Sequence, residues 1–244
     1  MALLSEADLR AMCLPEGMIL PLPAGTTLTP AALYYCNERG ITVEIAQTPF
    51  QSAHGKMTMS GGSMPTYVDA QTGRRSPDKP EHMTHLRDNL LVPKTHPRIR
   101  LRGKLDSLEA LLLQTIAQAN ELGRTEIASG LAECFALARD ILSAEVKEQP
   151  LPPFKLLGMD SGALRHASHH PEQFAGIPHP VPHADMGALC LALNFLRTQV
   201  REAELAAAAA FCSDREGCAR TDLVEALNRM SSAVYLLFLK ELTA

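Results

Sequence analysis

The sequence lacks the short motifs by which many nucleotide-binding and metal-binding proteins are recognised. It has no Gly-x-x-x-x-Gly-Lys-Ser/Thr segment, so a P-loop is excluded and any nucleotide site must be built from helices and a loop. It has no Cys-x-x-Cys pair, which argues against a zinc ribbon. No apolar run approaches the roughly 20 residues needed to span a bilayer. The formal net charge of −4 argues against nucleic acid or an anionic membrane as the main partner.

The N-terminal residues also lack the basic start and apolar core of a signal peptide, so we expect a cytosolic protein. In a reducing cytosol the cysteines are expected to be free thiols. Cys212 and Cys218 are close enough in sequence to meet across a turn, and we interpret them as structural or incidental because no histidine lies near them. The six cysteines are Cys13, Cys36, Cys134, Cys190, Cys212 and Cys218.

Residues 1–97 are expected to form a small N-terminal β-α-β element followed by a mobile loop segment. Residues 18–22 and the β-branched residues 41–45 are typical of short strands. Between them, Thr29 and Pro30 predict a helix start, and the helix would run to Glu38 before Gly40. Residues 49–97 are rich in Gly, Pro, Ser, Met and His and lose hydrophobic periodicity, which predicts a loop with one short element at 87–92.

Residues 98–244 are predicted to be largely helical. The 46% hydrophobic content of the 244-residue chain is enough for a sizeable core. Four long helices with short turns and one long connector, 150–183, predict an antiparallel bundle. Asp185 and Asp222 are typical of helix starts, by capping or by their charge. The expected helices are 104–122, 125–146, 185–212 and 222–242.

The third of these helices carries two parallel stripes. Its polar stripe contains two arginines four residues apart, which would repel mildly unless something anionic lay over both. This anion could be a bound polyphosphate or carboxylates from neighbouring helices. The alternative interpretation is that the polar stripe is an ordinary solvated helix face with no ligand. The apolar stripe is Met186, Leu189, Leu193, Leu196 and Val200, and the polar stripe is Asn194, Arg197, Arg201 and Glu204.

Together with two further segments, 103–110 and 227–235, this helix resembles the corrinoid (cobalamin) adenosyltransferases. The likeness is to the ethanolamine-utilisation type and, more distantly, to the propanediol-utilisation type. In the latter, helices carrying Gly-x-x-Asp, Leu-x-x-x-Arg-x-x-x-Arg and Asn-Arg-Leu-Ser line the ATP site. The residues at the matching places are Asp106, Arg197, Arg201 and Asn228. The resemblance also includes 28–32, 84–86 and the segment from Asp185 onward.

The resemblance implies transfer of the 5′-deoxyadenosyl group of ATP to the reduced cobalt of cob(I)alamin, giving adenosylcobalamin and tripolyphosphate. The residues implied in catalysis are Asp106, Arg197 and Arg201. Those implied in ATP binding are Arg197, Arg201, Glu204, Asn228 and Asn194. Mg2+ is implied by the polyphosphate rather than by a visible ligand set. The resemblance also implies a fifth, shorter helix and a homotrimer with active sites between subunits, for which 49–97 is the candidate loop.

Asp106 lies in a very apolar helix, where a buried carboxylate without a partner would cost roughly several kcal/mol. We therefore expect an arginine partner, and the resemblance implies Arg197. The alternative is that Asp106 caps its helix.

The family pattern breaks at one place. Ethanolamine-type enzymes can carry a histidine followed by a Cys-Cys-x-x-Cys cluster that binds a transition metal. His54 matches the histidine region, but residues 55–81 contain no cysteine. Thiolates supply most of the affinity of such a site, so no protein-bound metal is expected and His54 is left without a role.

The connector before the arginine helix is rich in histidine, and the resemblance places it near the corrinoid. Its candidates for corrinoid binding are His169, Phe174 and His183. The alternatives are a histidine metal site, or loop histidines hydrated by water.

The leading hypothesis is a cytoplasmic enzyme, with a bacterial microcompartment as an alternative setting. Its partners would be ATP, a corrinoid and a reductase or B12-dependent lyase or dehydratase. The rivals are a non-catalytic corrinoid- or nucleotide-binding protein, and an interaction module that docks to a shell through its N-terminal element. The joint presence of Asp106, Arg197, Arg201 and Asn228 favours the enzyme.

Overall fold

The computed structural model describes residues 3–12, 14–15, 17–23, 26–45, 66–213, 215 and 217–244. The chain divides into two compact units, residues 1–61 and 62–244. Each unit has its own apolar core.

The first unit contains the predicted β-α-β element. Strands β2 and β4 pair in parallel, with Ile19 opposite Thr42, and helix α2 connects them. The Thr29 side chain accepts a hydrogen bond of 3.2 Å from the Ala32 amide, and Pro30 occupies the first turn, so α2 begins where the sequence predicts. The elements are β1 (Leu3–Leu4), α1 (Glu6–Ala11), β2 (Ile19–Leu22), β3 (Thr27–Leu28), α2 (Pro30–Glu38) and β4 (Thr42–Ile45).

The second unit begins with a small sheet, where the sequence predicted a loop. The strand order is β6-β5-β8-β7, with β5 and β8 parallel and the other pairs antiparallel. The loop prediction is therefore wrong for most of 67–93, because strands this short leave no long alternation of apolar and polar residues, although the short element predicted at 87–92 overlaps β8. His54 lies outside the described residues. The strands are β5 (Tyr67–Asp69), β6 (Arg75–Ser76), β7 (Met83–Arg87) and β8 (Leu90–Pro93).

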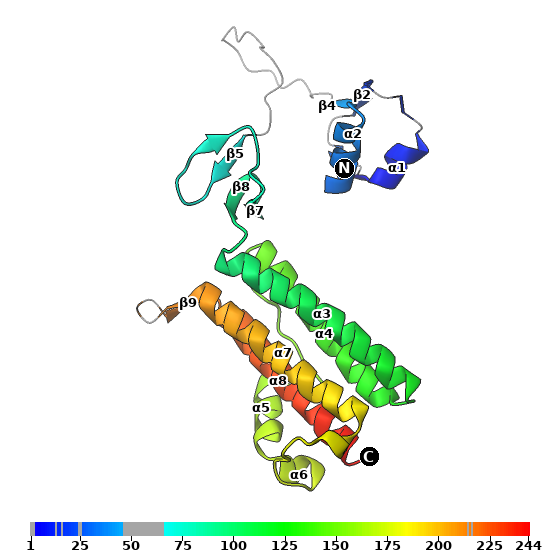
Figure 1. Ribbon diagram of the computed structural model, residues 1–244, viewed down its shortest axis with the longest axis vertical. Helices are drawn as coiled ribbons and strands as arrows, with labels where there is room; N and C mark the ends of the chain where they lie inside the picture. The colour runs from blue at the N-terminus through cyan, green and yellow to red at the C-terminus, as the bar shows by residue number, and fades with distance from the viewer. Residues whose placement is uncertain are drawn as a thin grey trace. The chain divides into compact units, whose positions relative to one another are not determined.

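The rest of the second unit is the predicted helical bundle. Four long helices lie side by side, and the shorter α5 packs beside α8 (Figure 1). Their buried faces form one continuous core, which includes Leu105, Leu193 and Leu227. The helices are α3 (Pro97–Glu121), α4 (Thr125–Val146), α5 (Ser161–His169), α6 (Pro171–Ala175), the short 3-10 helix η1 (Ala184–Met186), α7 (Ala188–Phe211) and α8 (Thr221–Leu242). None of the described helices is long and apolar enough to cross a membrane.

Two helix starts differ from the prediction. Helix α3 begins at Pro97 rather than Lys104, where the His96 ring accepts a hydrogen bond of 3.2 Å from the Arg98 amide. The first turns of α3 contain several arginines, so the apolar periodicity used to predict the start of the helix is not visible there. Asp185 lies in η1 rather than at the cap of α7, which begins at Ala188 after Gly187.

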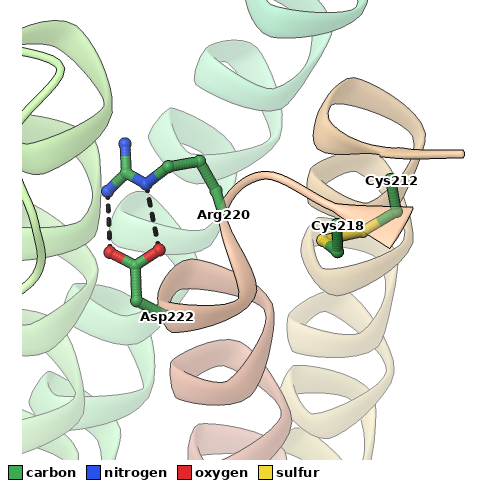
Figure 2. Close-up of a disulfide and its surroundings, with 4 residues drawn as sticks. All are labelled: Cys212, Cys218, Arg220 and Asp222. Carbon is green, nitrogen blue, oxygen red and sulfur yellow. Dashed lines mark hydrogen bonds and ion pairs between the residues drawn. A yellow bond between two sulfur atoms is a disulfide. The ribbon is translucent and has the colours of Figure 1, made fainter. Parts of the chain in front are cut away.

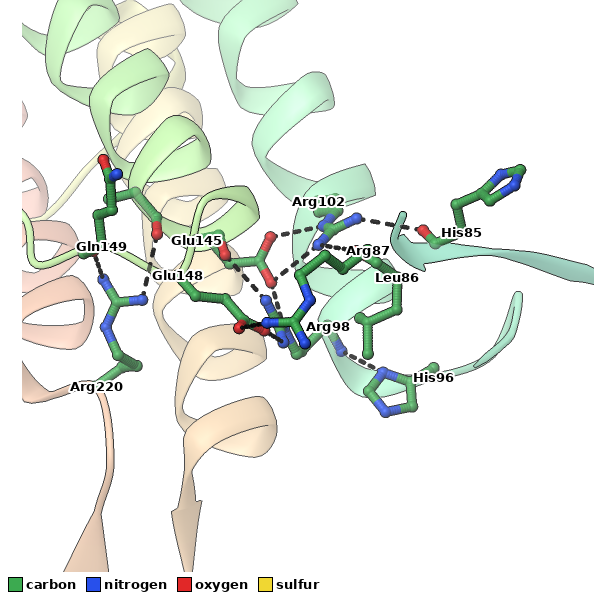
Figure 3. Close-up of polar contacts among 11 residues, drawn as sticks. His85, Leu86, Arg87, His96, Arg98, Arg102, Glu145, Glu148, Gln149 and Arg220 are labelled. Atoms are coloured by element: carbon green, nitrogen blue, oxygen red, sulfur yellow. Dashed lines mark hydrogen bonds and ion pairs between the residues drawn. The ribbon is translucent and has the colours of Figure 1, made fainter. Parts of the chain in front are cut away.

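Those arginines join the sheet to the bundle. The Glu145 carboxylate of α4 is fully buried, and the guanidinium groups of Arg98 and Arg102 both donate to it (Figure 3). Arg102 also donates to the Leu86 carbonyl of β7 at 3.0 Å. A buried carboxylate is tolerated only when paired and hydrogen-bonded, so Glu145 fixes both arginines, and Arg102 in turn fixes β7 against α3.

Cys212 and Cys218 form a disulfide, so the expectation of free thiols is wrong for this pair. They lie directly opposite in the hairpin of β9 (Cys212–Ser213) and β10 (Gly217–Cys218), at the turn from α7 into α8 (Figure 2). Cys36, Cys134 and Cys190 are free and buried. Burial raises the pKa of the Cys134 thiol to about 12, which keeps it protonated.

Candidate active site

A cavity of about 410 Å³ lies between α7, α8 and the connector that precedes α7. Both helices contribute side chains at three- and four-residue steps, which places each set on one helix face. The set from α7 is the predicted polar stripe, Asn194, Arg197, Arg201 and Glu204. The set from α8 is Asn228, Ser231, Ser232 and Tyr235.

The two arginines of the cavity carry no counter-charge within the described part of the chain. The Arg197 guanidinium lies over the Tyr235 ring, 5.3 Å from its centroid, and Arg201 is exposed at the mouth. Burial and the neighbouring Arg201 charge lower the pKa of Arg197, although an arginine stays charged in proteins. Two guanidiniums on one helix face that form no ion pair with a carboxylate among the described residues can bind an anion with several oxygens.

Asn228 connects the two helices beneath this pair. Its Nδ2 donates to Glu204 Oε1 at 2.7 Å, and its Oδ1 accepts from Arg229 Nη2 at 2.5 Å. Both ends of the amide are therefore fixed, and one oxygen of the Glu204 carboxylate is occupied by this hydrogen bond.

The connector closes one side of the cavity through an aromatic contact. His179 Nδ1 and the Tyr235 hydroxyl are hydrogen-bonded at 2.7 Å, and their rings stack with centroids 5.8 Å apart. Burial raises the pKa of Tyr235, so the hydroxyl is protonated at neutral pH. Tyr235 thus contacts Arg197 through its ring and the connector through its hydroxyl.

The structure brings together all five residues that the sequence assigned to ATP binding. Asn194, Arg197, Arg201, Glu204 and Asn228 all line the cavity.

Of the residues assigned to corrinoid binding, His169 lines the cavity. Phe174 packs on the bundle core instead, and His183 is exposed beside Asp185, 4.0 Å away. Their role in corrinoid binding stays a prediction.

Asp106 does not lie where the sequence predicted. It is exposed on α3, between the inward-facing Leu105 and Leu108, and makes no ion pair among the described residues. The predicted contact with Arg197 is absent within one chain, because the helical turn points Asp106 out of the apolar face that surrounds it in the sequence.

The cavity residues that sequence reasoning missed include Ser231, Ser232, Tyr235 and His179. The signal for the first three was present, because positions 228, 231, 232 and 235 lie on one face of a helix. His179 had no such signal, because it lies in an irregular connector where sequence spacing does not fix position.

The fold and site define a helical-bundle protein with an arginine-lined cavity for a polyanionic ligand. The chain belongs to the cobalamin adenosyltransferase family, whose model matches residues 76–241. Corrinoid adenosyltransferase EutT from Escherichia coli (strain K12) is 31% identical over 252 residues, covering 98% of this chain and 92% of that protein. The protein of the same name from Salmonella typhimurium (strain LT2) is 31% identical, with 97% and 91% covered. No solved structure gives a significant match.

Proposed function

We propose that this chain transfers the 5′-deoxyadenosyl group of ATP to the reduced cobalt of a corrinoid, with tripolyphosphate as the leaving group. The observation that carries the proposal is the pair Arg197 and Arg201, which share one cavity face and have no carboxylate partner among the described residues. Family membership supports the same activity.

The chemistry requires little covalent work from the protein. The reduced cobalt of the substrate supplies an electron pair to the 5′ carbon of ATP, the bond from that carbon to the phosphate oxygen breaks, and the electrons leave on tripolyphosphate. Arg197 and Arg201 stabilise the negative charge that builds on this leaving group. The Tyr235 ring orients Arg197, and Asn228 positions the Glu204 carboxylate through a hydrogen bond.

Mg2+ fits this site only when it is bound together with the phosphates of ATP. Among the described residues no group of three His, Cys, Asp or Glu side chains is arranged to hold a metal, and Glu204 is the single carboxylate lining the cavity. Mg2+ is usually held by one or two carboxylates together with substrate phosphates, so Glu204 would be its protein ligand. When bound, the ion neutralises charge on the polyphosphate.

The exposed Asp106 supports a site completed by a second copy. It lies on α3, and the exposed apolar side chains of Leu113 on α3 and of Leu191 and Phe195 on α7 would be buried in an oligomer. We infer a homotrimer in which Asp106 of one subunit meets the arginines of the next. The catalytic role assigned to Asp106 depends on this arrangement.

The connector, with His169 at the cavity, is the proposed corrinoid side of the site. A cytoplasmic or microcompartment setting, and a reductase or B12-dependent lyase or dehydratase as partner, follow from the proposed reaction, which needs a supply of reduced corrinoid and a consumer of its product.

The experiment is a product analysis. The purified chain is mixed with ATP, Mg2+ and chemically reduced cobalamin, and adenosylcobalamin and tripolyphosphate are quantified together. We expect the two products in equal amounts. Adenosylcobalamin without tripolyphosphate, or no cobalt–carbon bond at all, would reject the proposal.

A further inference from the structure

We propose that the chain carries a second anion site, in a cavity of about 650 Å³ between α5, the β9–β10 hairpin and the first half of α8. Its ligand is a small molecule bearing a phosphate or carboxylate group. The two cations that line it are Arg229 of α8 and Arg165 of α5. The volume is within the usual range of small-molecule pockets.

The first observation is that Arg229 is buried and lacks an oppositely charged partner among the described residues. Only 8% of the residue is exposed, and within the described part of the chain its guanidinium makes one hydrogen bond, the donation from Nη2 to Asn228 Oδ1. Its Nε is buried without a hydrogen-bond partner. A buried guanidinium that bonds only a neutral amide is costly, because its lost hydration is not replaced by an opposite charge. In this proposal a ligand supplies the missing counter-charge.

The second observation is the charge of the cavity wall. Glu225 is the carboxylate among the lining residues, but its oxygen accepts from the Ser161 hydroxyl, and it forms no ion pair with Arg229 or Arg165 in the described part of the chain. Two guanidiniums against one carboxylate leave one positive charge uncompensated. The fork of an arginine matches phosphate and carboxylate oxygens equally well, which sets the class of ligand.

The second cavity is separate from the arginine-lined one and shares a single residue with it. Asn228 presents its Oδ1 to Arg229 and its Nδ2 to Glu204. An anion that draws Arg229 towards itself would loosen the Asn228 amide and, through it, the Glu204 carboxylate of the first cavity. Binding of an anion in the second cavity would therefore change the position of the Glu204 carboxylate in the first.

The test follows the side-chain Nε–Hε resonance of Arg229 by NMR while the full-length protein is titrated with inorganic phosphate or, separately, acetate at constant ionic strength. Arg229→Lys assigns the resonance. We expect a saturable shift with at least one anion, weakened about tenfold by Arg165→Gln, as for loss of one charge-assisted contact. Arg201→Gln, which alters only the first cavity, is expected to leave the titration unchanged.

The two anions distinguish a phosphate ligand from a carboxylate ligand, and either result supports the site. The proposal fails if neither anion shifts the resonance. It also fails if Arg201→Gln weakens the shift as much as Arg165→Gln does. A shift that depends on protein concentration without added anion would assign the counter-charge to a second copy of the chain and would equally overturn it. Arg165 is exposed, so its variant is expected to fold and the comparison does not depend on Arg229 variants.

Discussion

Asn228 of α8 donates through Nδ2 to Glu204 Oε1 of α7 at 2.7 Å, and this bond joins the two helices that build the arginine-lined cavity. The same amide accepts from Arg229. Replacing Asn228 by leucine therefore leaves a buried guanidinium and a carboxylate without their partner. We expect a loss of about 1–3 kcal/mol in the free energy of unfolding and a higher KM for ATP.

Urea unfolding and ATP kinetics measure the two effects. Ser231→Ala is the matched control for the unfolding measurement, because among the described residues its hydroxyl makes one hydrogen bond, to the Asn228 carbonyl of the same helix, and its loss should cost about 1 kcal/mol or less. If Asn228→Leu were as mild as this control, the bridging role of the amide would be wrong.

Glu145 provides a second prediction, on stability. It is fully buried and accepts from Arg98 and Arg102, so Glu145→Gln leaves two guanidiniums without their shared charge. We expect a loss of about 3–5 kcal/mol, the range for breaking a buried ion pair. Glu148→Gln is the control, because Glu148 bonds Arg87 and Arg98 at the surface and should cost about 1 kcal/mol or less. Thermal or urea denaturation measures the free energy of unfolding of both variants. Equal losses for Glu145→Gln and Glu148→Gln would contradict the assigned role of Glu145.

Asp222 predicts a dependence of stability on pH. Hydrogen bonds from Arg220, at 2.9 Å, and from the Leu151 amide lower the pKa of Asp222 from 3.8 to about 2. A lowered carboxyl pKa stabilises the fold above the unfolded value and loses that contribution as pH falls through the folded value. Asp222→Asn should therefore cost about 1–2 kcal/mol near neutrality, and the difference should vanish between about pH 4 and pH 2.

The matched variant is Asp140→Asn, at an exposed position of α4, which should follow the unmodified protein at every pH. A difference between Asp222→Asn and the unmodified protein that persisted unchanged at pH 2 would reject the ion pair as its cause.

The disulfide predicts a thiol count. Of the six cysteines, Cys212 and Cys218 are joined and three are free; Cys13 lies outside the described residues and is counted as a thiol because no cysteine of the chain is left to pair with it. Protein purified without reductant and unfolded in guanidinium should react with four equivalents of a thiol reagent, and with six after reduction. Six equivalents before reduction would show that the hairpin is not cross-linked in the isolated protein.

The bundle could be predicted because its helices carry long, regular apolar stripes. The polar stripe of α7 predicted four of the cavity residues, since helical spacing alone places Asn194, Arg197, Arg201 and Glu204 on one face. The small sheet of residues 67–93 could not, because its strands are two to five residues long and its order is set by pairing between distant segments. The exposure of Asp106 could not be predicted either, because it depends on the direction of one side chain between two buried leucines.

The most direct test of the central claim is the rate of cobalt–carbon bond formation, followed spectroscopically as a function of ATP concentration. Arg201→Gln is compared with Arg139→Gln, which removes an exposed arginine of α4 outside the cavity. The account predicts that Arg201→Gln lowers kcat/KM for ATP by about 100-fold, the order for losing one contact to a developing anion, while Arg139→Gln leaves it unchanged. Equal kcat/KM values for the two variants would contradict the assignment of the cavity to the polyphosphate of ATP.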